Sequence, residues 1–229
     1  IAKEQNWSTP LSEINDFYET QLLDLLPQMT NLRHVQITGG EPLSHKKKNL
    51  DFLSKLSKDV KIQYRTNGSI YDNEVTDFLK TFDTVHFLTS IDGQEDVLHY
   101  QRPRSEWNVI EENLKQYKDK GFTIINTMTV TSFNIHQIPK FINEQGYLFD
   151  YMVYTPVRFP EEYRVNLIQP SKLKQIVEEL KQAENPEQGD LKNIIKDIEE
   201  NYMDTPSDKI IEKFWKQAEY MKQHRGVDL

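Results

Sequence analysis

The sequence has 229 residues with a formal net charge of −8, and 37% of them are hydrophobic and 28% charged. This length fits one domain, or one domain with an appendage, and the charge argues against nucleic acid or an anionic membrane as the main partner. No apolar stretch approaches the roughly 20 residues of a membrane span and no signal-peptide pattern opens the chain, so we expect a cytoplasmic protein. There are no cysteines, which excludes disulfides, thiol nucleophiles and thiolate-bound metals within these residues.

Turn signals divide the chain into alternating helical and extended segments. Thr9 and Pro10 predict the start of a first helix, because proline is favoured at the first helical position. Ser105 can cap a later helix that Gly121 ends, and Pro139 bends or delays the next one. Together with the helical periodicity, these signals predict helices over residues 10–26, 50–56, 73–82, 105–121, 135–145, 171–184, 188–202 and 207–224. Extended runs predict strands over residues 34–38, 60–64, 84–90, 122–130 and 151–155.

This alternation predicts an α/β fold with a parallel sheet and right-handed crossovers. The chain opens on a helix and shows five strand–helix units, so a partial (β/α)6 barrel that lacks its first strand fits better than a closed eight-stranded barrel. The spacing alone leaves a doubly wound sheet open as an alternative. We expect the partial barrel to cover residues 1–156 and a helical C-terminal extension to cover residues 157–229.

Glycines and polar residues gather where the predicted strands end. In parallel α/β folds these carboxyl ends meet at one edge of the sheet, and ligands bind there. The candidate binding residues at this edge are Thr38, Gly39, Gly40, Glu41, Pro42, Thr66, Asn67, Ser90, Asp92, Asn126 and Tyr154, joined by Arg102 in the segment after the third strand.

The chemistry of these residues suits a polar small molecule. The paired glycines let backbone carbonyls approach a ligand closely, and a carbonyl row backed by Glu41 suits an ammonium group. Ser90 and Asp92 could reach vicinal hydroxyls, and Arg102 offers a planar fork for a carboxylate. Ammonium, carboxylate and ribose together describe an amino-acid nucleoside, whereas the lack of a glycine-rich phosphate loop makes a nucleotide polyphosphate a poorer fit.

Three of these clusters carry a family resemblance. The segment Gly39-Gly40-Glu41-Pro42 resembles the GGEP motif of radical S-adenosylmethionine (SAM) enzymes. Thr66-Asn67-Gly68 and Ser90-Ile91-Asp92-Gly93 are similar to the later motifs of that superfamily, and they stand in the same order. The roles that this resemblance implies are the methionine end of SAM for Thr38 to Pro42, the ribose for Ser90, Asp92 and Asn126, the carboxylate for Arg102 and the adenine side for Tyr154.

The resemblance also implies an activity. A radical SAM enzyme reduces SAM through a [4Fe–4S] cluster and releases a 5′-deoxyadenosyl radical that abstracts hydrogen from a substrate. The run from Tyr100 to Leu114 looks like the twitch or SPASM-like branch, whose substrates are often peptides or proteins. Cofactors would therefore be SAM and a [4Fe–4S] cluster, and partners would be an electron donor and an unknown, peptide-like substrate.

The sequence departs from the family at its defining element. The superfamily holds its cluster with a Cys-x3-Cys-x2-Cys loop after the first strand, and this chain has no cysteine. We expect that strand and loop to lie upstream of Ile1, which leaves this chain inactive by itself. The alternative is a cluster-free relative that binds SAM or a nucleoside as a regulator or scaffold, and a third is an unrelated α/β enzyme.

Two candidate residues have ordinary structural explanations as well. Glu41 could hold the glycine loop by accepting backbone N–H bonds instead of meeting a ligand, and Asp92 could form an ion pair with Arg102. The six histidines show no metal-ligand spacing, so we expect no zinc site.

Overall fold

The computed structural model describes residues 21–183 and 190–225, without the side chain of residue 225. Most of the first predicted helix, including its start at Thr9 and Pro10, lies outside the described residues. Its described end comprises α2 (Leu23–Leu25) and a 3-10 turn over Leu26–Gln28. Leu26 is buried in the main hydrophobic core.

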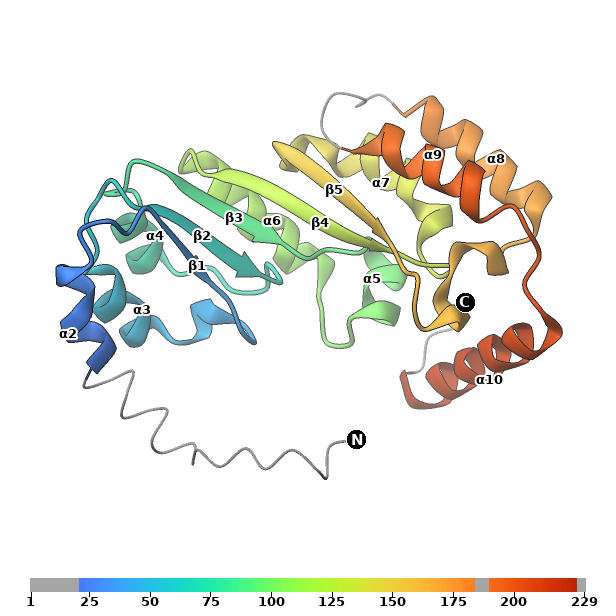
Figure 1. Cartoon of the computed structure of the whole chain (residues 1–229), viewed down its shortest axis with the longest axis horizontal. Coiled ribbons are helices and arrows are strands. Elements are labelled where there is room, and N and C mark those ends of the chain that lie inside the picture. Colours follow the sequence, from blue (N-terminus) through green and yellow to red (C-terminus); the bar gives the residue numbers. More distant parts are fainter. Residues whose placement is uncertain (1–20, 184–189, 226–229) are drawn as a thin grey trace.

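The five predicted strands are confirmed, and they form one parallel sheet in the order in which they follow along the chain (Figure 1). They are β1 (His34–Ile37), β2 (Lys61–Thr66), β3 (Val85–Thr89), β4 (Thr123–Val130) and β5 (Tyr151–Pro156). A doubly wound sheet reverses its strand order at a switch point, and the described strands show no such reversal. The fold is therefore the partial barrel and not its doubly wound alternative.

The helices between the strands are α3 (Lys46–Leu53), α4 (Asn73–Leu79), α6 (Trp107–Asp119) and α7 (Ile138–Gln145). Asp72 caps α4 by accepting the Val75 N–H at 2.9 Å. Gly121 follows α6 with a φ of +80°, the left-handed conformation in which helices commonly end. Pro139 delays α7, because residues 135–137 form a 3-10 turn before the α-helix begins.

Three details differ from the sequence predictions. The helix predicted over residues 50–56 begins and ends earlier, as α3 (Lys46–Leu53). The N-cap of α6 is Glu106 and not Ser105, whose N–H instead donates to the Arg102 carbonyl at 3.1 Å. A short helix, α5 (Glu95–Gln101), precedes α6 and was outside the predicted set. Seven residues give fewer than two full periods of apolar spacing, so α5 lacks the pattern by which longer helices are predicted.

The core lies between the sheet and the helices. Alternate strand residues such as Tyr64, Phe87 and Ile124 are fully buried, and Phe87 stacks on Tyr117 of α6 with ring centroids 4.1 Å apart. Each side chain of this kind stabilises the fold by about 1.5–3 kcal/mol through burial. The opposite face, which we call the open face, carries half-exposed or exposed side chains that include Gln36, Arg65, Leu88, Ser90, Thr127 and Val153.

The three predicted C-terminal helices are also confirmed, as α8 (Pro170–Lys181), α9 (Leu191–Asn201) and α10 (Asp208–Arg225). Buried residues of α8 and α9 belong to the same core as the barrel helices. In contrast, α10 packs through Phe214 and Met221 on a separate cluster with Tyr100, Phe133 and Tyr163. None of the described helices is both long and apolar enough to cross a membrane.

Candidate functional site at the strand ends

The loop after β1 presents its backbone to solvent. Gly39 and Gly40 have φ angles of +100° and +52°, in the region that side chains with a Cβ rarely adopt. A Cβ built on either glycine would meet no atom within 4 Å, so the space beside this backbone is open. The loop can therefore receive a ligand group against its main chain.

The Glu41 carboxylate holds this loop to the end of β2. Its oxygens accept the Thr66 hydroxyl at 2.8 and 2.9 Å and the Asn67 N–H at 2.9 Å. Thr66 is buried and also accepts the Gly68 N–H at 3.0 Å, while the Asn67 side chain accepts the Ser69 N–H at 2.8 Å. Of its two sequence interpretations, Glu41 therefore has the contacts of the loop-holding one.

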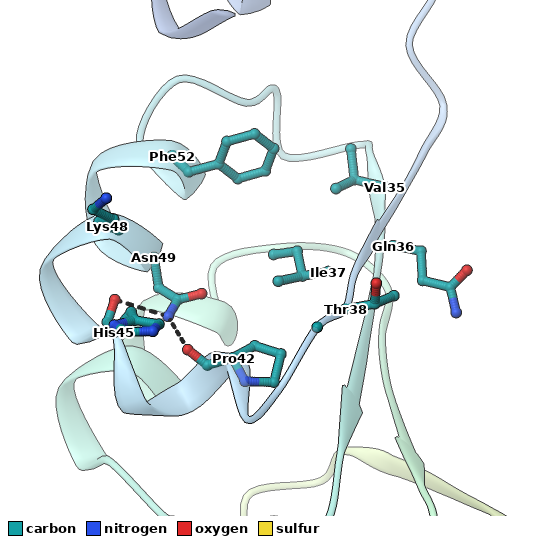
Figure 2. A pocket seen from close by; sticks show the side chains of 10 residues that line it. Val35, Gln36, Ile37, Thr38, Pro42, His45, Lys48, Asn49 and Phe52 are labelled. Carbon is teal, nitrogen blue, oxygen red and sulfur yellow. Dashed lines mark hydrogen bonds between the residues drawn. The ribbon is translucent and has the colours of Figure 1, made fainter. Parts of the chain in front are cut away.

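A pocket of about 330 Å³ lies beside the glycine loop, between β1 and α3 (Figure 2). Val35 and Ile37 point from β1 toward Phe52 of α3, whereas Gln36 points away from the pocket. Asn49 closes one end, because its amide donates to the carbonyls of Pro42 at 2.7 Å and His45 at 2.9 Å. Asn49 thus holds the turn after the glycines to α3.

Asp92 is buried at the carboxyl ends of β3 and β4, with 5% of its surface exposed. One carboxylate oxygen accepts the Thr129 N–H at 2.8 Å, and the other accepts the Arg102 Nε–H at 2.7 Å. Burial raises the pKa of the Asp92 carboxyl above its usual 3.8, and Arg102 and the Thr129 N–H oppose this. The ion pair expected as the alternative for these two residues is present.

Ser90 lies two residues before Asp92 and is half-buried on the open face. Its backbone N–H donates to the Thr66 carbonyl at 3.1 Å, which ties the end of β3 to that of β2. The structure thus aligns the strand ends that carry the three motifs.

Asn126 lies on the other side of the sheet, fully buried among the helices. Its amide oxygen accepts the Thr89 hydroxyl and the Ile91 N–H, both at 3.0 Å, and its amide nitrogen donates to the Ile91 carbonyl at 2.9 Å. All three of these hydrogen bonds are made to groups of the protein. Asn126 holds the loop after β3 onto β4 and does not reach the open face.

Tyr154 shares the helix-facing side with its register partner Met128 and with Met152. The residue is 7% exposed, and burial raises the pKa of its hydroxyl. The side chains of β5 that share the open face are Tyr151, Val153 and Thr155, next to Ile125, Thr127 and Thr129 of β4. These open-face residues were missed from sequence, although the alternation of buried and half-exposed residues along β4 could have indicated them.

Several solved structures are similar to this chain. No curated protein sequence matches the chain. Among solved structures, anSMEcpe with bound AdoMet matches with 16% identity and a TM-score of 0.50, over 73% of this chain and 48% of that one. SuiB of Streptococcus suis bound to S-adenosylmethionine matches with 15% identity and a TM-score of 0.45, over 65% and 36%. A domain of pyruvate-formate lyase-activating enzyme from Bacteroides vulgatus matches with 13% identity and a TM-score of 0.44, over 86% and 96%.

The likeness to anSMEcpe at a TM-score of 0.50 and 16% identity shows the fold alone. The chain spans about half the length of the anSMEcpe structures that it matches. The match to a sequence-family model identifies the family as well. The model of the radical SAM superfamily matches residues 16–144, which is more than half of the chain and includes every motif described above. The chain therefore belongs to the radical SAM superfamily.

Proposed function

We propose that this chain supplies the SAM-binding part of a radical SAM enzyme. The observation that carries the proposal is the exposed glycine loop, whose two left-handed residues stand in the GGEP motif and are held in place by Glu41. Backbone carbonyls of Thr38 to Gly40 would accept hydrogen bonds from the ammonium group of the methionine end. Pro42 begins the 3-10 turn that follows the loop and fixes its exit.

Of the other candidate residues, some would contact SAM and others would hold the strand ends in place. Ser90 would meet the ribose from the open face, and Arg102 would bind the carboxylate through its outer nitrogens. Asn126 and Tyr154 would act by holding the strand ends, because their side chains lie on the helix-facing side. The adenine side would then be formed by open-face residues of β4 and β5, such as Thr127 and Val153.

The residues present do not fit a [4Fe–4S] cluster. The chain has no cysteine, and no group of three histidine or acidic side chains in the described residues could hold a metal ion. We propose that the cluster is held by cysteines outside these 229 residues. One observation supports a further strand there: β1 pairs only with β2 among the described strands, so its other edge is open to another strand.

The lack of cysteine also favours a second candidate, a cluster-free protein that binds SAM as a regulator or scaffold. Reconstitution of the full-length protein with iron and sulfide under anaerobic conditions separates the two. An absorbance of a [4Fe–4S] cluster, with SAM cleavage after reduction, supports the enzyme. SAM binding without either supports the regulator. The peptide or protein substrate, the electron donor and the barrel boundary at residue 156 stay predictions.

The binding site itself is tested by two matched glycine substitutions and isothermal titration with SAM. Gly39 and Gly121 both have left-handed φ angles and open space around a built Cβ, but Gly121 precedes β4 at the opposite end of the sheet. Gly39→Leu should weaken SAM binding at least tenfold because the side chain occupies the ligand's space, whereas Gly121→Leu should leave it unchanged. Equal effects of the two substitutions would sink the proposed site.

A further inference from the structure

Asp92 accepts hydrogen bonds through both its backbone carbonyl and its carboxylate. Its backbone carbonyl accepts the Asn134 amide at 2.7 Å and the Gln101 amide at 3.3 Å, so the residue is held from the loop after β4 and from α5. Its carboxylate is held from β4 itself through Thr129 and from the end of α5 through Arg102. Four contacts therefore fix the position of one carboxylate.

Arg102 directly follows α5, and its side chain is 34% exposed while that of Asp92 is 7% exposed. Among the described residues, the Arg102 guanidinium donates a hydrogen bond from Nε to the Asp92 carboxylate. A guanidinium has five donors in a rigid fork. Anchoring Nε on a buried carboxylate therefore fixes the position of the group and leaves donors of the outer nitrogens for another acceptor.

The same geometry argues against a direct contact between Asp92 and the ribose. Both carboxylate oxygens are already engaged by protein donors, and the residue is 95% shielded by the surrounding protein, since its exposed fraction is 5%. Each oxygen keeps a second lone pair, but burial leaves a sugar hydroxyl little access to it. Of the two residues, Arg102 is the one with surface left for a ligand.

We propose that Asp92 is a positioning residue, which orients the Arg102 guanidinium so that its outer nitrogens grip the carboxylate of SAM. This inference rests on the proposed function and assigns Asp92 a role different from the ribose contact that the family resemblance implies. Burial disfavours the ionised form of this carboxyl, so the site holds the charge against a cost in desolvation. The carboxylate is then explained by what its charge does to Arg102.

The test uses two probes, SAM and 5′-methylthioadenosine, which has the adenine and ribose but no carboxylate. Asp92→Asn keeps an acceptor for the Thr129 N–H and removes the charge that orients Arg102. It should weaken SAM binding about tenfold, the value of one charge-assisted hydrogen bond, and leave 5′-methylthioadenosine binding unchanged. Arg102→Lys should do the same, and the double variant should lose little more than either single one.

The control is Asp150→Asn, because Asp150 accepts a backbone N–H of the same strand, that of Ile124 at 2.7 Å, at the opposite end. It should change neither affinity. An equal loss of both probes in Asp92→Asn would mean that Asp92 meets the ribose, and an unchanged SAM affinity would mean that Arg102 needs no anchor. Either result overturns the inference.

A second measurement does not depend on ligand binding. The Nε–H proton of Arg102 should be protected from exchange with solvent in the wild type and lose that protection in Asp92→Asn, as followed by NMR. Protection that persists in the variant would contradict the anchoring of Arg102. If the wild type binds neither probe while this protection is present, the proposed function fails and the geometric part of the inference stands.

Discussion

At the end of β1 the backbone is exposed, and the Glu41 carboxylate ties it to the end of β2. At the ends of β3 and β4, buried side chains bond to the protein from several directions, as Asp92, Asn126 and Asn134 do. The first region leaves its polar main chain open to a ligand, whereas the second uses its polar groups to hold the strand ends. A polar residue at a strand end can thus serve a ligand or the scaffold, and burial tells the two apart.

The largest effect on stability is expected when a buried support of the second region is removed. Asn126→Ala leaves the Ile91 N–H and carbonyl and the Thr89 hydroxyl without their partner in a buried place. We expect a loss of about 2–4 kcal/mol in the free energy of unfolding, measured with urea. Thr127→Ala, which removes one hydrogen bond on the open face, should cost about 0.5–1.5 kcal/mol. Similar losses in both would show that burial does not separate the regions.

A smaller loss of stability is expected when the Glu41 carboxylate, which ties the end of β1 to that of β2, is removed. Glu41→Ala removes the acceptor of the Thr66 hydroxyl and the Asn67 N–H, which are partly buried, and should cost about 1–3 kcal/mol. Glu74→Ala is a suitable comparison, because Glu74 is exposed and pairs with Lys46 on the surface. That substitution should change the free energy of unfolding by less than about 1 kcal/mol. Equal losses of stability in the two variants would mean that Glu41 does not hold these strand ends together.

The glycine loop should respond less still. Gly40→Ala places a Cβ at a φ of +52°, where there is space but the backbone conformation is unfavourable, so it should cost about 1–2 kcal/mol. Gly40→Asn should cost less, because asparagine tolerates the left-handed region better. Thermal unfolding of the two variants measures the difference. A larger loss in Gly40→Asn than in Gly40→Ala would contradict a purely conformational origin.

The smallest expected effect is a pH dependence at Asp92. Burial raises its pKa above 3.8, so the folded protein keeps this proton to a higher pH than the unfolded chain does. Ionisation therefore costs stability as the pH rises from 3.8 through the pKa of the folded state. Over that range the wild type should lose stability relative to Asp92→Asn, as measured by urea unfolding at several pH values. A wild type that gains on the variant instead would mean that Arg102 outweighs burial.

The sequence allowed the strands, their parallel order and the motif loops to be predicted, because each strand ends in a glycine or turn signal and is followed by a helical period. It also contained the information that Asn126 faces the helices. Along β4 the apolar residues Ile124, Met128 and Val130 share its parity, so the pattern of period two assigns Asn126 to the buried side. The same argument applies to Tyr154, which follows Met152 on β5.

Other features depend on contacts between distant segments. Glu41 and Thr66 are 25 residues apart, and Asp92 and Thr129 are 37 apart, so nothing local indicates that these carboxylates bind protein donors. The short helix α5 has too few turns to show a period, although it leads to Arg102. These are the places where the site could be listed from sequence but its roles could not be assigned.

The central claim is that SAM binds at the exposed glycine loop and the open face. Amide NMR of the protein titrated with SAM tests it residue by residue. The account predicts that the largest shifts fall on Gly39, Gly40 and Ser90, while Gly121 at the other end of the sheet does not respond. Shifts centred on Gly121, or SAM binding that leaves Gly39 and Gly40 unperturbed, would contradict it.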